Sequence, residues 1–253
     1  MLAPALLMPK IVAISELAGA AIMKIYASGT TVETKADNSP VTEADRVGEE
    51  IILAALRELT PEIPIVAEES AAAGDVPDVG DKPFWLVDPL DGTKEFISRN
   101  GEFTVNIALI ENRQPLLGVV FAPAIETMWW GAQGHGASRR VGDKVEAIQT
   151  RPAPAAGGVA VASRSHRDDK TNAWLQEKGI EETIAAGSSL KFCVVAEGRA
   201  DYYPRFGPTM EWDVAAGHAV LRAAGGRVTT LEDDPFIYTK PEFRNAGFIA
   251  YGA

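Results

Sequence analysis

Short apolar runs rich in β-branched and aromatic residues follow one another in the first half of the chain, and they constrain the fold more than any other feature. The runs are IPIVAEE (63–69), FWLVDPL (84–90), FTVNIALI (103–110), LLGVVFAP (116–123) and ETMWWGAQGHGA (126–137). Runs of this composition, bounded by Gly, Pro or Asn, predict β-strands. We therefore expect a sheet here, and the flanking sequences decide what covers it.

Two stretches before the first of these strands have helical spacing. In residues 1–26 the regularly spaced apolar positions are Ile11, Ile14, Leu17, Ala18, Ala21, Ile22 and Ile25. A second helix is predicted to begin at Thr42 and to turn inward Val47, Ile51, Ala54, Ala55 and Leu59. Lys10, Glu16 and Lys24 interrupt the first stretch too often for a membrane span, and it lacks the pattern of a signal peptide. We expect an amphipathic core helix and no integral membrane segment.

The Pro- and Ala-rich stretch RPAPAAGG, residues 151–158, predicts a boundary between two subdomains. The first, 1–150, is expected to be α+β, and the second, 151–253, to be α/β. In the second, strands are predicted at 158–164, 200–204, 226–230 and 246–252, and helices at 168–178, 188–197 and 212–226. Helices alternate with strands in both parts, so the predicted fold class is α/β or α+β with layered helices and sheets.

Acidic residues outnumber basic ones, 35 against 24, which gives a net charge of −11. Surfaces that bind nucleic acids or anionic membranes need clustered cations, so we expect no nucleic-acid partner. A small anionic substrate would need a local positive site, which a metal ion can provide. The single cysteine, Cys193, excludes an internal disulfide and a thiolate zinc cluster, and it favours a reducing, cytoplasmic location. We expect Cys193 to be buried.

The segment VDPLDGTKEF, residues 87–96, ends an apolar strand in two aspartates. The proline between Asp88 and Asp91 forces a bend, which can bring both carboxylates and a carbonyl around one point. Hard cations such as Mg²⁺ take such oxygen ligands and share them with a substrate phosphate. An ordinary Asx-type turn before Gly92 explains the motif about as well.

Other acidic residues occupy comparable places at the ends of predicted elements. Glu68 and Glu69 end the apolar run IVAEES. Asp45 closes the pattern TEAD, which fits a capping box, and Asp213 lies near a predicted helix start, where aspartate is a favoured N-cap. Capping alone accounts for each of these two residues, but together the four acidic sites favour a cluster on one face.

Three motifs, IVAEES, WLVDPLDGTKEF and EWDVAAGHAVLRAAGG, resemble in this order and spacing the inositol monophosphatase superfamily. Its members are lithium-sensitive and Mg²⁺-dependent, with signatures of the form WxxDPxDGT and WDxAAG. Further segments, among them ASRSH and GSSLKFCVVAEGRADYYPRFGPTMEWD, look like the bacterial CysQ branch of 3'(2'),5'-bisphosphate nucleotidases. The resemblance implies a layered αβαβα sandwich, as in related sugar phosphatases.

The resemblance also implies a metal centre. Glu68, Asp88 and the Leu90 carbonyl would hold one Mg²⁺, and Asp88, Asp91 and Asp213 a second, with a looser third ion near Glu68. Such metal pairs clamp the attacking and leaving oxygens of a phosphoryl transfer. A metal-activated water would be the nucleophile. Thr93 and Asp45 would take its proton, with Glu68 as a further catalytic residue.

Substrate contacts are carried over in the same way. Gly92 and Thr93 would offer backbone N–H groups to the scissile phosphate, beside Leu90, Asp91 and Asp213. The nucleotide would meet two segments and one arginine: Ser163, Arg164, Ser165 and His166 of SRSH, Ser188, Ser189 and Lys191 of GSSLK, and Arg205. A helix start with a solvated lysine also explains GSSLK. His218 is expected to be a packing residue.

The expected function is Mg²⁺-dependent hydrolysis of adenosine 3',5'-bisphosphate (PAP) to AMP and phosphate, with the sulfonated form PAPS, converted to APS, as a second substrate, in sulfur assimilation. The alternatives are an inositol monophosphatase or a fructose-1,6-bisphosphatase of the same fold, and a regulatory protein that keeps only the fold. The sequence leaves open a monomer or a homodimer and a peripheral association with the inner membrane.

Overall fold

The computed structural model describes residues 3–29, 31–35, 40–154, 156–162 and 168–253. Its first part contains α1 (Pro4–Ser28), β1 (Val32–Thr34), β2 (Pro40–Thr42), α2 (Glu43–Leu59), β3 (Ile65–Ala67), α3 (Glu68–Ala72), β4 (Phe84–Asp91), α4 (Thr93–Ile97), β5 (Thr104–Glu111), β6 (Gln114–Ala122), β7 (Thr127–Ala132), β8 (Gly136–Val141) and β9 (Lys144–Ile148). Its second part contains β10 (Val159–Ala162), α5 (Asp169–Glu177), β11 (Glu182–Ala185), α6 (Leu190–Ala196), β12 (Tyr202–Arg205), β13 (Thr209–Met210), α7 (Glu211–Ala223), β14 (Arg227–Thr229), β15 (Arg244–Asn245) and β16 (Phe248–Tyr251). The strands predicted from the apolar runs are all present.

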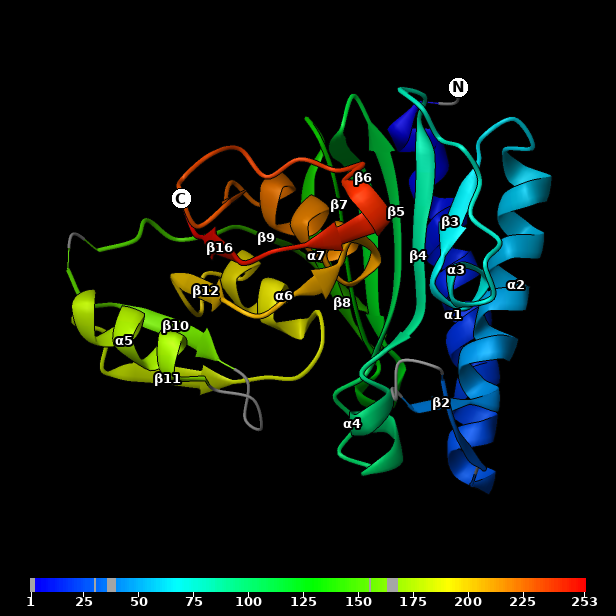
Figure 1. The fold of residues 1–253 in the computed structure, drawn as a ribbon, viewed down its shortest axis with the longest axis horizontal. Coiled ribbons are helices and arrows are strands. Elements are labelled where there is room, and N and C mark those ends of the chain that lie inside the picture. The colour runs from blue at the N-terminus through cyan, green and yellow to red at the C-terminus, as the bar shows by residue number, and fades with distance from the viewer. Residues whose placement is uncertain (1–2, 30, 36–39, 155, 163–167) are drawn as a thin grey trace.

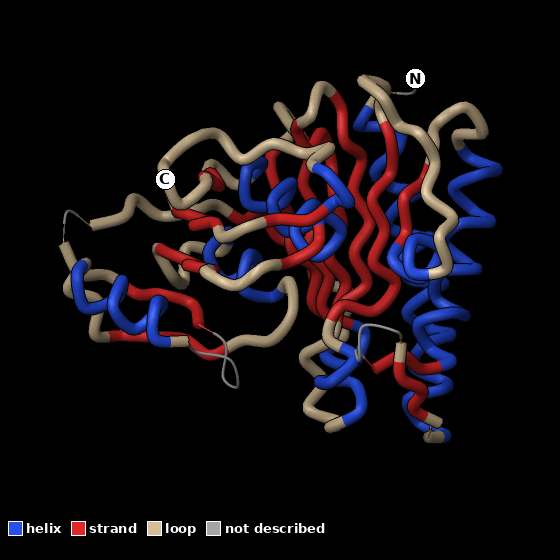
Figure 2. The backbone as a smooth tube through the Cα atoms, viewed as in Figure 1, coloured by secondary structure: helices blue, strands red, loops and turns tan. Residues whose placement is uncertain are grey.

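The elements form five layers (Figure 1). Helices α1 and α2 cover one face of a seven-stranded sheet of order β3-β4-β5-β6-β7-β8-β9. Helices α6 and α7 lie between this sheet and a five-stranded sheet of order β11-β10-β12-β16-β14. On the outer side, α5 packs through Leu175 against Ala160 of β10. The αβαβα architecture is therefore confirmed, and Figure 2 shows the two sheets as separate groups of strands.

Helix α1 is a core helix that also has the length and hydropathy of a membrane span. Leu7, Ile11 and Ile22 are fully buried against the first sheet and α2. Leu17, predicted to face inward, is 61% exposed. The helix therefore has one face in the core and one exposed face.

The buried face of α2 differs from the predicted one by one position. Ala54 is exposed and Val47 only half-buried, whereas Ile52 and Leu56 are fully buried. The reason is that two acidic residues, Asp45 and Glu49, share the buried face. A prediction from apolar residues alone could not include them.

Helix α7 is the centre of the molecule and is apolar on nearly all sides, as expected for a helix between two sheets. Small residues permit a close approach: a methyl group at Gly118 of β6 would lie 2.8 Å from the Ala219 side chain. Helix α7 also contacts β4, the strand that ends in Asp88 and Asp91. The boundary at residue 150 stays a prediction, because α7 comes from the second part and packs on the first sheet.

Candidate active site

The two aspartates of DPLDGT lie on either side of a β-bulge at the end of β4. Asp88 pairs with Asn106 and Asp91 with Thr104 of β5, so β4 has one residue more than its partner in between. Pro89 has no N–H for a regular ladder, which favours this irregularity. The Leu90 N–H donates to Asp88 Oδ1 at 2.9 Å. The Asx-type bond weighed as an alternative is therefore present, and it uses one oxygen of Asp88.

Gly92 turns the chain from β4 into α4. Its φ of 94° is left-handed, and a Cβ here would lie 2.1 Å from Ser188 Oγ, so only glycine fits. Thr93 is the first residue of α4, and its hydroxyl donates to Asp45 Oδ1 at 3.2 Å. The predicted pair Thr93 and Asp45 is thus brought together.

Asp45 uses its two oxygens for different partners. Oδ2 accepts from the N–H and from the hydroxyl of Thr42, each at 2.7 Å, and Thr42 Oγ1 accepts from the Ala44 N–H. This is the predicted capping box of α2. Oδ1 accepts from the Thr93 hydroxyl. Burial raises the pKa of Asp45, and the hydrogen bonds from Thr42 act against this effect.

Asp213 is fixed in a similar way on α7. It is the third residue of the helix, and its Oδ2 accepts from the Met210 N–H at 2.8 Å. The capping role weighed as an alternative is therefore present, but Met210 is the N-cap and Asp213 reaches back to it from the third position of the helix.

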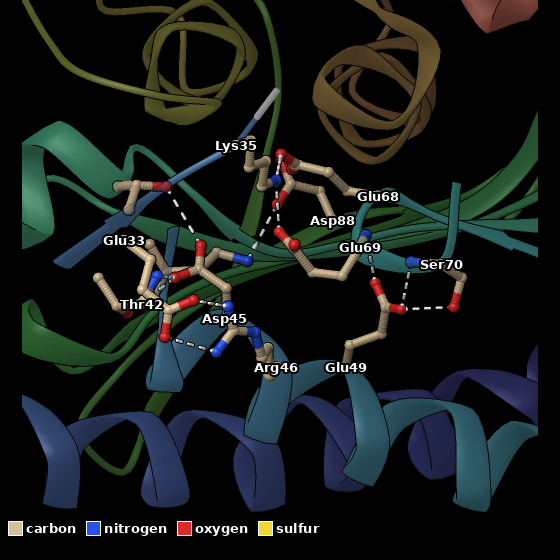
Figure 3. A network of polar contacts seen from close by, with 12 residues as sticks. Glu33, Lys35, Thr42, Asp45, Arg46, Glu49, Glu68, Glu69, Ser70 and Asp88 are labelled. Atoms are coloured by element: carbon tan, nitrogen blue, oxygen red, sulfur yellow. Dashed lines mark hydrogen bonds and ion pairs between the residues drawn. The ribbon is translucent and has the colours of Figure 1, made fainter. Parts of the chain in front are cut away.

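Glu68 follows β3 directly and begins α3. Its Oε1 lies 2.7 Å from Nζ of Lys35, which also contacts Glu69 Oε1 at 2.6 Å (Figure 3). Burial would lower the pKa of Lys35, but the two glutamates raise it above its ordinary value. Burial raises the pKa of Glu69 to about 7. Lys35 was missed in the sequence, where a lone lysine before a loop gives no signal.

The carboxylates repel one another. Burial raises the pKa of Asp88 well above its usual range, and the charges of Glu68, Asp91 and Asp213 raise it further. Burial likewise raises the pKa of Asp213, with Asp91 and Glu68 as the next causes. Among the described residues no three acidic side chains are arranged as ligands around one point. The chemistry of the four carboxylates nevertheless fits Mg²⁺. Their oxygens are the ligands that a hard cation prefers, and a bound cation would relieve their mutual repulsion.

The two serines of GSSLK contact the acidic cluster. Ser189 is 1% exposed, and its Oγ lies 2.8 Å from Asp91 Oδ2 and accepts from Asn106 Nδ2 at 2.9 Å. Ser188 Oγ lies 2.9 Å from the Asp91 carbonyl oxygen. Both hydroxyls hold Asp91 in place, and their contact with a nucleotide stays a prediction. Asn106 was missed, although an amide inside the apolar run FTVNIALI was a signal.

A cavity of about 180 Å³ opens beside the carboxylates. Lys191 is 7% exposed, and its ammonium lies 5.5 Å from the centroid of the Tyr203 ring without an ion pair to a described residue. Burial lowers the pKa of Lys191. Arg205 Nε is buried and unbonded. The lining residues are Asp91, Gly92, Glu95, Gly187, Ser188, Lys191, Phe192, Tyr203, Arg205, Thr209, Asp213 and Val214.

The remaining predicted residues have mixed outcomes. Ser163, Arg164, Ser165 and His166 lie outside the described residues. His218 is buried and bonds through Nδ1 to the Tyr238 hydroxyl at 3.0 Å, which confirms a packing role. Cys193 is fully buried, as predicted.

Comparisons with known proteins identify the family to which the chain belongs. The model of the inositol monophosphatase family matches residues 8–248. Two curated 3'(2'),5'-bisphosphate nucleotidases CysQ, from Salmonella typhimurium and Escherichia coli K12, are each 50% identical over 91% of this chain and 94% of their own length.

Solved structures give the same result. The crystal structure of CysQ from Bacteroides thetaiotaomicron, described as a bacterial member of the inositol monophosphatase family, superposes with a TM-score of 0.80 at 40% identity and covers 96% of both chains. An inositol monophosphatase from Thermotoga maritima superposes with a TM-score of 0.78 at 26% identity, over 96% of this chain and 91% of its own. The chain belongs to the inositol monophosphatase family.

Proposed function

We propose that this protein hydrolyses PAP to AMP and phosphate as a 3'(2'),5'-bisphosphate nucleotidase. The observation that carries the proposal is the position of the cavity, which joins a carboxylate cluster to two cationic side chains, Lys191 and Arg205. The names of the CysQ relatives at 50% identity support it. A bisphosphate needs two anion sites, and this cavity offers two of different kinds.

The reacting phosphate would lie at the carboxylates with Mg²⁺. Glu68, Asp88 and the Leu90 carbonyl would hold one ion, and Asp88, Asp91 and Asp213 another, with a third ion near Glu68 as an extension. Bound Mg²⁺ supplies charge stabilisation to the phosphate and makes a water more acidic. Phosphatases of this family are typically metal-dependent, which supports the proposal.

Thr93 and Asp45 would take up the proton of the attacking water. The Thr93 hydroxyl gives its own hydrogen to Asp45, so its oxygen lone pairs are free to accept a second one. A proton can then pass from the water to Thr93 while Thr93 passes its own to Asp45. The backbone N–H groups of Gly92 and Thr93 would orient the phosphate oxygens.

The second phosphate would bind Lys191 and Arg205. Lys191 is a buried ammonium without a carboxylate partner among the described residues, and a phosphate would give it one. This site favours a nucleotide bisphosphate over a monophosphate such as inositol 1-phosphate. PAPS also carries charge beyond the 3'-phosphate, so it is included as a second substrate.

The test is a panel of phosphate-release assays on PAP, PAPS, inositol 1-phosphate and fructose 1,6-bisphosphate, in Mg²⁺ with and without Li⁺. We expect PAP to be hydrolysed with the highest kcat/KM and Li⁺ to inhibit. Asp88→Asn should abolish turnover by a folded protein, because Asp88 is assigned to both ions. Turnover retained by this variant, or a preference for inositol 1-phosphate, would contradict the proposal.

A cytoplasmic location stays a prediction.

A further inference from the structure

Glu49 is a buried carboxylate that the chemistry above does not use. It lies on α2, one turn after Asp45, and is 5% exposed. Its Oε2 accepts from the Glu69 N–H at 2.8 Å. Its Oε1 accepts from the N–H of Ser70 at 2.8 Å and from its hydroxyl at 2.6 Å (Figure 3). Three donors thus satisfy both oxygens of a charge that would otherwise be costly to bury.

These bonds tie the first turn of α3 to α2. The first N–H groups of a helix have no partner inside the helix, and a side chain of the N-cap often accepts them. The N-cap of α3 is Ala67, which has no such side chain. Glu49 accepts two of these N–H groups from a different helix. Glu68 is the residue immediately before them, so its backbone is fixed by the same contacts.

Helix α2 also holds the other end of the site. Asp45 and Glu49 are four residues apart, which places them on the same helix face. Asp45 bonds to Thr93, and Glu49 bonds to the turn that carries Glu68. One rigid element therefore sets the distance between Thr93 and Glu68, which come from α4 and α3.

We propose that Glu49 is a positioning residue that fixes Glu68, through the first turn of α3, in the place where it binds its cation. This inference rests on the proposed function, because it takes Glu68 as a metal ligand. A ligand that is ordered in advance costs less to immobilise when the ion binds, so affinity for the ion is higher. Glu49 is not among the residues that line the proposed substrate cavity, so its role would be exerted through Glu68.

The first test uses Glu49→Gln, which keeps the size of the side chain. Glutamine has one acceptor oxygen, and its NH₂ group would face an N–H of α3, so at least one bond is lost. We expect the Mg²⁺ concentration for half-maximal PAP hydrolysis to rise at least about ten-fold, the size typical of lost supporting contacts at metal sites. The KM for PAP at saturating Mg²⁺ should stay within about two-fold, because Glu49 does not line the substrate cavity.

Glu50→Gln is the matched control. Glu50 is the next residue on α2, is exposed and forms no hydrogen bond to α3 among the described residues. Its Mg²⁺ requirement should equal that of the wild type. The second readout is amide hydrogen exchange of residues 69–72 in the metal-free protein, which should be at least about ten-fold faster in Glu49→Gln only.

An active Glu49→Gln variant with the Mg²⁺ requirement of the wild type would overturn the proposal. So would faster exchange without a changed requirement, since this would show a purely structural role. If Glu49→Gln does not fold, Ser70→Ala is the second test, because it removes the hydroxyl that donates to Glu49 Oε1. The Mg²⁺ concentration for half-maximal hydrolysis should then rise by a smaller factor. If this concentration does not change in Ser70→Ala, the proposal is overturned. A wild type without Mg²⁺-dependent hydrolysis would instead overturn the proposed function.

Discussion

Two carboxylates of the site, Asp45 and Asp213, are each held by a backbone N–H at the start of their own helix. In both cases the third helical residue reaches back to the N-cap with Oδ2. The capping bond fixes the side chain and uses Oδ2, so Oδ1 stays available for the role proposed above. Helix capping and catalysis are therefore not rival explanations of such residues, because the cap supplies the orientation that the chemistry needs.

Lys191 should determine the preference for a bisphosphate. Lys191→Met keeps the length of the side chain and removes the charge, so the second phosphate loses a charge-assisted bond worth about 1.5–3 kcal/mol. We expect the KM for PAP to rise by roughly 10–100-fold, with kcat within about three-fold.

The control substrate for Lys191→Met is adenosine 3'-phosphate, which lacks the 5'-phosphate, and its KM should not change. Lys178→Met, at an exposed residue after α5, is the control variant. An equal rise of KM for both substrates would show that Lys191 does not bind the second phosphate.

His218 should make the protein less stable in acid. Burial lowers the pKa of His218 from 6.5 to about 3, with Arg222 and Lys240 as further causes. Between these values the unfolded chain binds one proton more than the folded one. The contribution of this group to the free energy of unfolding is therefore fully present above about pH 6.5. It decreases by about 1.4 kcal/mol for each pH unit as the pH falls from 6.5 toward 3.

The measurement is the free energy of unfolding by urea between pH 7.5 and 4.5, for the wild type and for His218→Gln. The variant loses the bond to Tyr238 at every pH, so only the slopes are compared. We expect the slope of the free energy of unfolding against pH to be smaller in the variant, by the amount that corresponds to about one bound proton. Equal slopes would mean that His218 is protonated in the folded state.

At the scale of elements, apolar patterns predicted the strands better than the helix faces. The runs FWLVDPL and FTVNIALI form the interior strands β4 and β5, and both faces of these strands are buried, which explains their continuous apolar sequences. The buried face of α2 was displaced because Asp45 and Glu49 belong to it. A polar residue that is satisfied by distant partners looks like a surface residue in the sequence.

Several elements were missed for a related reason. Strands β9 and β11 lie at sheet edges, where most of their side chains are exposed or half-buried. Short helix α3 has no fully buried residue and no side-chain cap of its own. Edge strands and single turns depend on contacts with other elements, which local sequence does not record.

At the scale of the whole molecule, the motifs named the acidic residues that the structure brings together, whereas the residues that support them could not be found from the sequence. The charges of Glu68, Asp91 and Asp213 raise the pKa of Asp88, so the structure brings together the four residues that the family resemblance grouped; their role as metal ligands stays a prediction. Lys35, Glu49 and Asn106 came only from the fold, because their partners lie far away in the chain. The alternation of helices and strands is compatible with several layered architectures. The resemblance to the family selected the five-layered αβαβα sandwich among them.

Mg²⁺ should stabilise the whole protein by relieving the repulsion at this cluster. At about 100 times its Kd, an ion that binds only the folded state adds about 2.7 kcal/mol, which corresponds to a rise in Tm of roughly 5–10 °C for a chain of this size.

Scanning calorimetry with EDTA, with Mg²⁺ and with Na⁺ at equal ionic strength would measure this rise. Asp213→Asn should show a smaller response to Mg²⁺, because it removes one assigned ligand. If Mg²⁺ and Na⁺ give the same Tm, the cluster does not bind the ion.

The origin of α7 in the second part of the chain has a consequence for biosynthesis. Asp213 joins Asp88 and Asp91 only when α7 has packed between the sheets, and Ser189 and Lys191 also come from the second part. A growing chain therefore contains Asp88 and Asp91 before Ser189, Lys191 and Asp213 have been translated. The proposed metal centre therefore stays incomplete until α7 has been synthesised and has packed between the two sheets.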